Sequence, residues 1–92
     1  PSDLDAYSQL ADIGALARIC DKRPADAVTD DWVDSGYPQR TSRVRQKLAE
    51  RYGEPAVAER DIVSVHGCFV EQKPAELRRQ YEAILRALEA RF

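Results

Sequence analysis

Cys20, Cys68 and His66 are the first candidates in this sequence for covalent catalysis or for metal binding. A thiolate can attack an electrophile once a nearby imidazole has taken its proton, and both side-chain types bind zinc. A zinc site needs about four ligands, however, and the positions of His66 and Cys68 diverge on a helix. No strand–turn–helix nucleophile elbow is visible around either cysteine. We therefore expect no enzyme activity, no metal site and no cofactor.

Cys20 and Cys68 lie on the inward faces of two predicted helices and could form a disulfide bond. The bond would close a loop of about 48 residues, which the chain-entropy model equates with about 4 kcal/mol of stability. The alternative is a pair of separate thiols, which pack as small hydrophobic groups in a cytosolic protein. We favour the disulfide because small domains of oxidising compartments often depend on one.

The start of the chain bears on the same choice. The first residue is Pro1 and the sequence contains no methionine, as expected for a processed or trimmed chain. Removal of a signal peptide and a cloning boundary both explain such a start. Together with a disulfide, the first explanation favours a periplasmic or secreted protein, whereas free thiols would favour a cytoplasmic one.

Length and composition limit the class of protein. A chain of 92 residues has room for one domain, which we place at residues 1–92. Hydrophobic residues make up 43% and charged residues 33%, which is typical of a globular domain with a well-solvated surface. The net charge of −2 argues against a general nucleic-acid binder. No apolar run approaches the roughly 18 residues of a membrane span, so we expect a soluble chain.

The spacing of apolar residues predicts an all-α fold, a small bundle of four to five helices. We expect helices at about 2–21, 24–34, 41–52, 55–70 and from Pro74 to the end. Gly14 would permit the close approach of another helix. Gly36 would end the second helix in a left-handed conformation, and Tyr37-Pro38 would adopt an extended or turn geometry. The apolar face of the last helix would consist of Leu77, Tyr81, Ile84, Leu85, Leu88 and Phe92.

Residues 62–66, with the sequence IVSVH, are the least regular part of this pattern. Their β-branched side chains are typical of a strand, yet Ala58, Ile62, Val65 and Phe69 also keep helical spacing. No second convincing strand exists to pair with them, and a lone strand leaves backbone groups unsatisfied. We therefore expect a helix here.

Charge is segregated along the chain, with an acidic segment up to residue 34 followed by a basic one. The basic helix would present Arg40, Arg43, Lys47 and Arg51 on one stripe, and Trp32 and Tyr37 bracket the loop before it. We predict that these six residues contact a protein partner, which could be acidic. The same cations could instead form a solvated or intramolecular face, or contact nucleic acid through residues 40–51.

In chain length and in the separation of Cys20 from Cys68, the sequence resembles small periplasmic helical proteins such as the acid-stress chaperones. Secretion pilotins and periplasmic immunity proteins have the same general form. Our functional hypothesis is a non-enzymatic, secreted or periplasmic protein-binding module that is immunity-, pilotin- or chaperone-like. The alternative is a cytosolic helical assembly or regulatory module with free thiols.

Overall fold

A computed structural model describes residues 2–68 and 73–92 of the chain. In these residues there are five α-helices and no strand. The helices are α1 (Ser2–Ile19), α2 (Ala25–Asp34), α3 (Tyr37–Tyr52), α4 (Glu54–Arg60) and α5 (Pro74–Glu89). The predicted all-α bundle of four to five helices is therefore confirmed.

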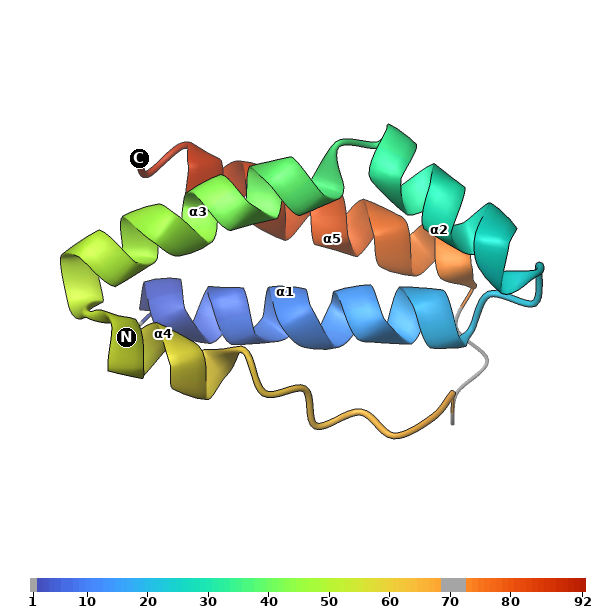
Figure 1. Cartoon of the computed structure of the whole chain (residues 1–92), viewed down its shortest axis with the longest axis horizontal. Helices are drawn as coiled ribbons and strands as arrows, with labels where there is room; N and C mark the ends of the chain where they lie inside the picture. Colours follow the sequence, from blue (N-terminus) through green and yellow to red (C-terminus); the bar gives the residue numbers. More distant parts are fainter. Residues whose placement is uncertain (1, 69–72) are drawn as a thin grey trace.

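The helices form a bundle around the antiparallel pair α1 and α5, which pack mainly against each other (Figure 1). Helix α3 crosses over this pair, with α2 and α4 at opposite ends of the molecule. Short connections at Ser35–Gly36 and Gly53 reverse or bend the chain between consecutive helices. Both chain termini lie at the end where α4 packs on α1.

The core is built from apolar side chains that recur at helical spacing. Fully buried members come from α1, α3, α4 and α5: Leu10, Leu48, Val57, Leu77, Leu85 and Leu88. The predicted apolar face of α5 is confirmed for its inward positions but was wrong for Phe92, which is 42% exposed. Phe92 lies beyond the end of α5 at Glu89, so the helical spacing no longer directs it toward α1.

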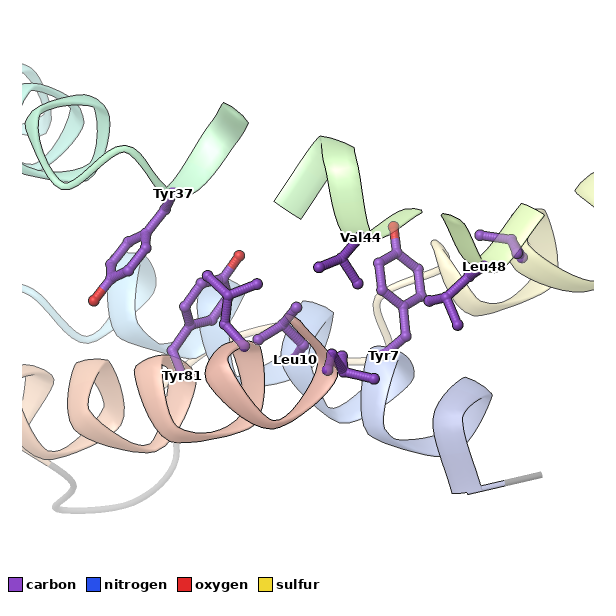
Figure 2. Close-up of a cluster of buried hydrophobic side chains, with 9 residues drawn as sticks. Tyr7, Leu10, Tyr37, Val44, Leu48 and Tyr81 are labelled. Atoms are coloured by element: carbon purple, nitrogen blue, oxygen red, sulfur yellow. The ribbon is translucent and has the colours of Figure 1, made fainter. Parts of the chain in front are cut away.

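Gly14 allows α5 to approach α1 closely, as the sequence predicted. A Cβ atom at Gly14 would lie 2.9 Å from Cε2 of Tyr81. The ring of Tyr81 packs against those of Trp32 and Tyr37, and each pair of ring centroids is 4.8 Å apart. We call these three residues the aromatic trio. Figure 2 shows Tyr37 and Tyr81 meeting in the core from α3 and α5.

Helix α3 begins four residues earlier than predicted, at Tyr37 instead of Thr41. Gly36 has a φ of 73°, the left-handed conformation expected where α2 ends. The expected break at Tyr37-Pro38 was wrong, because Pro38 occupies the first turn of α3. A proline costs no hydrogen bond there, since N–H groups of a first turn have no helical acceptor.

The predicted helix at 55–70 was wrong beyond Arg60, where α4 ends. Residues 62–66 instead run extended along α1 (Figure 1); positions 69 and 70 lie outside the described residues. Asp61 accepts a hydrogen bond from the Tyr7 hydroxyl, and Cys68 is bonded to Cys20. The α1 stretch between these two anchors is about 20 Å long. Seven residues cover about 23 Å when extended but only about 10 Å as a helix, so the chain must extend.

Candidate functional site

The disulfide between Cys20 and Cys68 is present, with the Cα atoms 5.2 Å apart. Neither cysteine is free, so neither thiol is a nucleophile or metal ligand in this state. Cys20 is buried, as expected, although α1 ends one residue before it. Cys68 is exposed in the extended segment rather than on an inward helical face. Within residues 2–68 and 73–92, no group of three or more His, Cys, Asp or Glu side chains could hold a metal ion.

Arg40, one of the predicted contact residues, is used inside the molecule. Its guanidinium donates hydrogen bonds to both carboxylate oxygens of Glu82 and both of Glu89 on α5, at 2.7–3.0 Å. The Arg40 side chain is only 21% exposed. These hydrogen bonds hold the pKa of Glu89 below its usual range. Arg40 therefore fastens α3 to α5.

Arg45, which was not among the predicted contact residues, has a similar internal role. It donates hydrogen bonds to Glu54 at the start of α4 and to Asp61 at its end. The bonds from Arg45 are the main reason that the pKa of Asp61 lies below its usual value. Arg45 and Asp61 are 16 positions apart in the sequence, so no local spacing could have paired them.

Unlike Arg40 and Arg45, the side chains of Arg43, Lys47 and Arg51 are exposed. They are spaced four residues apart and thus form one line on the outer face of α3, about 12 Å long. Lys47 lies 3.9 Å from Glu50, and the guanidinium of Arg51 lies 5.8 Å from the ring centre of Tyr52. We call these three residues the cationic stripe.

Trp32 and Tyr37 do not form an exposed loop. Tyr37 is 6% exposed and Trp32 is half-buried, both within the aromatic trio. The side of the trio that remains accessible borders a groove of about 360 Å³ between α1 and α3. We call it the aromatic groove; it is lined by Tyr7, Leu10, Ala11, Gly14, Arg18, Trp32, Tyr37, Pro38, Thr41, Ser42, Arg45, Val63 and Tyr81.

Polar groups are placed around this apolar groove. The hydroxyl oxygens of Thr41 and Tyr81 are 2.5 Å apart, and the guanidinium of Arg18 lies 4.7 Å from the ring centre of Trp32. Arg18 and Val63 were not predicted as site residues. For Val63, the alternating pattern of residues 62–66 was a sequence signal that could have identified it. Nothing in the sequence around Arg18 indicates that it belongs to a site.

A larger hollow of about 1000 Å³ lies beside the disulfide. Four of its charged lining residues, Asp21, Arg23, Asp31 and Arg78, form ion pairs with one another, and Lys22 and Lys73 also line it. Cys68 and Lys73 line this hollow, and positions 69–72 between them lie outside the described residues, so we place the candidate site on α3 and in the aromatic groove.

None of the described helices combines the length and the hydrophobicity that crossing a membrane requires. A scan against protein-family models, a search of curated proteins and a search of solved structures each returned no match for this chain.

Proposed function

We propose that this chain is a non-enzymatic protein-binding module that recognises an acidic surface of a partner protein through the cationic stripe. One observation carries the proposal: α3 divides its cations into two sets. Arg40 and Arg45 are each held by two carboxylates of the same molecule, whereas Arg43, Lys47 and Arg51 face outward together. In the described residues, none of the second set forms a salt bridge to another helix: Lys47 pairs with Glu50 on α3 itself, and Arg51 lies over the neighbouring ring of Tyr52. This set is therefore available to a partner.

An acidic protein suits the stripe better than a nucleic acid does. Binding to nucleic acid depends on neutralising many phosphates, typically with a broad basic surface. The stripe is narrow, and α2 exposes Asp26, Asp30 and Asp34 in the same molecule. A helix with carboxylates four residues apart would match the spacing of the stripe.

The proposed compartment is the periplasm or the extracellular space. Disulfides form and persist in oxidising environments and are rare in the cytosol. The bond between Cys20 and Cys68 supports this location, which in turn limits the partners to exported or cell-surface proteins.

The test uses two helical peptides of about 16 residues, with glutamate or with glutamine at every fourth position. We expect the glutamate peptide to bind and the glutamine peptide not to bind, as measured by fluorescence anisotropy. Exposed ion pairs contribute about 0.2–1 kcal/mol each, so Arg43→Ala/Lys47→Ala/Arg51→Ala should weaken binding by a factor between about 3 and 160.

The matched control is Lys22→Ala/Lys73→Ala/Arg79→Ala, which removes the same charge from exposed positions outside α3. It should bind the glutamate peptide within about 2-fold of the unmodified protein. Equal losses in the two triple variants would mean that net charge alone attracts the peptide. A duplex DNA of about 20 base pairs, at about 50 mM salt, is the third probe. Tighter binding to DNA than to peptide would overturn the proposal.

A further inference from the structure

Residues 62–66 have the surface pattern of a β-strand although no strand pairs with them. Ile62, Ser64 and His66 are exposed, whereas Val63 and Val65 between them are half-buried. This alternation with period two is the signature of an extended chain with one face on a core. Ile62 is 73% exposed, more than any other large hydrophobic residue among the described residues.

The backbone of this segment is hydrogen-bonded on one edge only. The Ser64 N–H donates to Oδ1 of Asp12 at 3.3 Å. In an extended chain the N–H and C=O groups of one residue point to one edge, and those of the next residue point to the opposite edge. Those of Val63 and Val65 therefore point away from Asp12, and neither residue has a backbone hydrogen bond within the described part of the chain.

The aromatic groove adjoins this segment, because Val63 is one of the residues that line it. On the other side the groove is lined by the start of α3 and by the aromatic trio. A second strand placed beside residues 62–66 in the groove could bond to their open edge. Its side chains would then pack against Trp32 and Tyr81.

The charged residues of the groove indicate which charged side chain the second strand carries. Arg45 is neutralised by Glu54 and Asp61. Arg18 is exposed, rests on the ring of Trp32, and pairs with no carboxylate in the described residues. It is therefore the uncompensated charge of the groove, and a carboxylate is its natural partner.

We propose that the aromatic groove binds an extended peptide segment of a partner protein, which adds as a β-strand to residues 62–66 and places a carboxylate on Arg18. This goes beyond the proposed function, because it uses a different surface and recognises a peptide backbone. Strand addition of this kind takes affinity from main-chain bonds and specificity from side-chain pockets. The acceptor edge is held at both ends, by the Tyr7–Asp61 hydrogen bond and by the disulfide, which reduces the entropy cost of binding.

The probes are acetylated and amidated heptapeptides that alternate valine with threonine and carry aspartate at the first or the last position. Both versions are needed because the added strand can run either parallel or antiparallel to residues 62–66. We expect one of them to bind the oxidised protein and to slow amide hydrogen exchange at Val63 and Val65, followed by NMR. The Ser64 amide, which is already bonded to Asp12, should change little. Equal protection of all three amides, or no binding at millimolar peptide, would overturn the proposal.

Two neighbouring proline substitutions separate the two edges of the segment. Val65→Pro removes an N–H from the open edge, and His66→Pro removes one from the edge that faces Asp12. We expect Val65→Pro to weaken peptide binding roughly 5-fold or more, and His66→Pro to leave it within about 2-fold. Circular dichroism and a thiol assay confirm that each variant is folded with its disulfide intact. If a proline variant does not fold, N-methylation of alternate amides in the bound peptide gives the same comparison.

Arg18 is tested with paired changes in protein and peptide. Arg18→Ala should weaken binding of the aspartate peptide roughly 5-fold and binding of the matching asparagine peptide by less than about 2-fold. Equal losses would place the carboxylate elsewhere and contradict the assignment. Sedimentation of the free protein is the last check: a dimer that protects Val63 and Val65 would show that a second copy, and not a partner peptide, occupies the groove. Loss of glutamate-peptide binding in the cationic-stripe variant has no bearing on these results, so the two proposals can fail separately.

Discussion

Identical side chains on α3 have different roles because each is directed by its place on the helix. Arg40 faces α5 and holds two carboxylates, while Arg43, three positions later, is exposed. The internal partners of Arg40 are more than forty positions away in the sequence. Arginine can form several parallel hydrogen bonds with carboxylates, which makes it suited to fastening one helix to another. The two residues therefore provide a matched pair for testing stability against recognition.

We expect Arg40→Ala to lower the free energy of unfolding by about 1–2 kcal/mol, since partly exposed charged hydrogen bonds are weakened by solvent. Arg43→Ala should stay within about 0.5 kcal/mol of the unmodified protein. Urea denaturation monitored by circular dichroism measures both changes. An unchanged free energy of unfolding in Arg40→Ala would show that α3 is held on α5 by apolar packing alone.

At the scale of the elements, the connection between α4 and α5 shows how distance can override local propensity. The extended segment returns from the α4 end of α1 to Cys20 at its other end (Figure 1). A helix rises about 1.5 Å per residue and a strand about 3.3 Å, so this return needs an extended chain. The disulfide attaches one end of this segment to Cys20, and the contacts of Asp61 with Tyr7 and Arg45 attach the other. The segment keeps its exposed apolar and polar groups at fixed positions as a result.

Removing the disulfide should act on this element first. In the chain-entropy model, Cys20→Ser/Cys68→Ser loses about 4 kcal/mol of stability, because about 48 residues are no longer closed into a loop. Urea denaturation measures this loss, and hydrogen exchange at the Ser64 amide should become faster than in the oxidised protein. The reduced unmodified protein serves as the control and should behave like the double variant. Equal stability of the oxidised and reduced forms would contradict the prediction.

Across the whole molecule, ion pairs and hydrogen bonds to carboxylates join elements that are remote in sequence. Asp3, at the start of α1, is a carboxylate that is only 2% exposed. It accepts a hydrogen bond from the Tyr52 hydroxyl at 2.7 Å and pairs with Arg91. The Tyr52 bond is the main cause that lowers the pKa of Asp3. The pKa values of Asp61 and Glu89 are lowered in the same direction by arginine partners.

These pKa shifts predict loss of stability in acid. A carboxylate whose pKa is lower in the folded state binds fewer protons folded than unfolded. Its contribution is present above the unfolded pKa, near 3.8 for Asp and 4.5 for Glu, and is lost as the pH falls through the lowered folded pKa. We expect the free energy of unfolding, from urea titrations between about pH 6 and 2.5, to decrease steadily below about pH 4.5.

The control for this prediction is Asp3→Asn, which keeps an oxygen acceptor for Tyr52 but cannot titrate. It should be less stable than the unmodified protein near neutral pH and should lose less stability on acidification. The pairing with Arg91 depends on the carboxylate charge, so its loss accounts for the difference at neutral pH. Stability that rises between pH 5 and pH 3 would contradict the sign of the shift.

The candidate site was only partly predictable from the sequence. Arg43, Lys47 and Arg51 were predicted as surface cations because four-residue spacing places them on one line, and they are exposed. Arg40 belongs to the same stripe in the sequence pattern, yet it forms salt bridges with Glu82 and Glu89 of α5. The groove residues Arg18 and Val63 lie 45 positions apart, and only packing brings them to one groove.

By itself, the sequence determined the helical class, the apolar face of α5 and the close approach at Gly14, because these depend on residue spacing within one helix. Its cysteine content pointed to the disulfide. Only the tertiary structure decided that Tyr37 is buried, that Arg40 is internal and that residues 62–66 are extended. Each of these outcomes is set by a partner remote in sequence, or by a distance between two anchors, and neither is encoded in local periodicity.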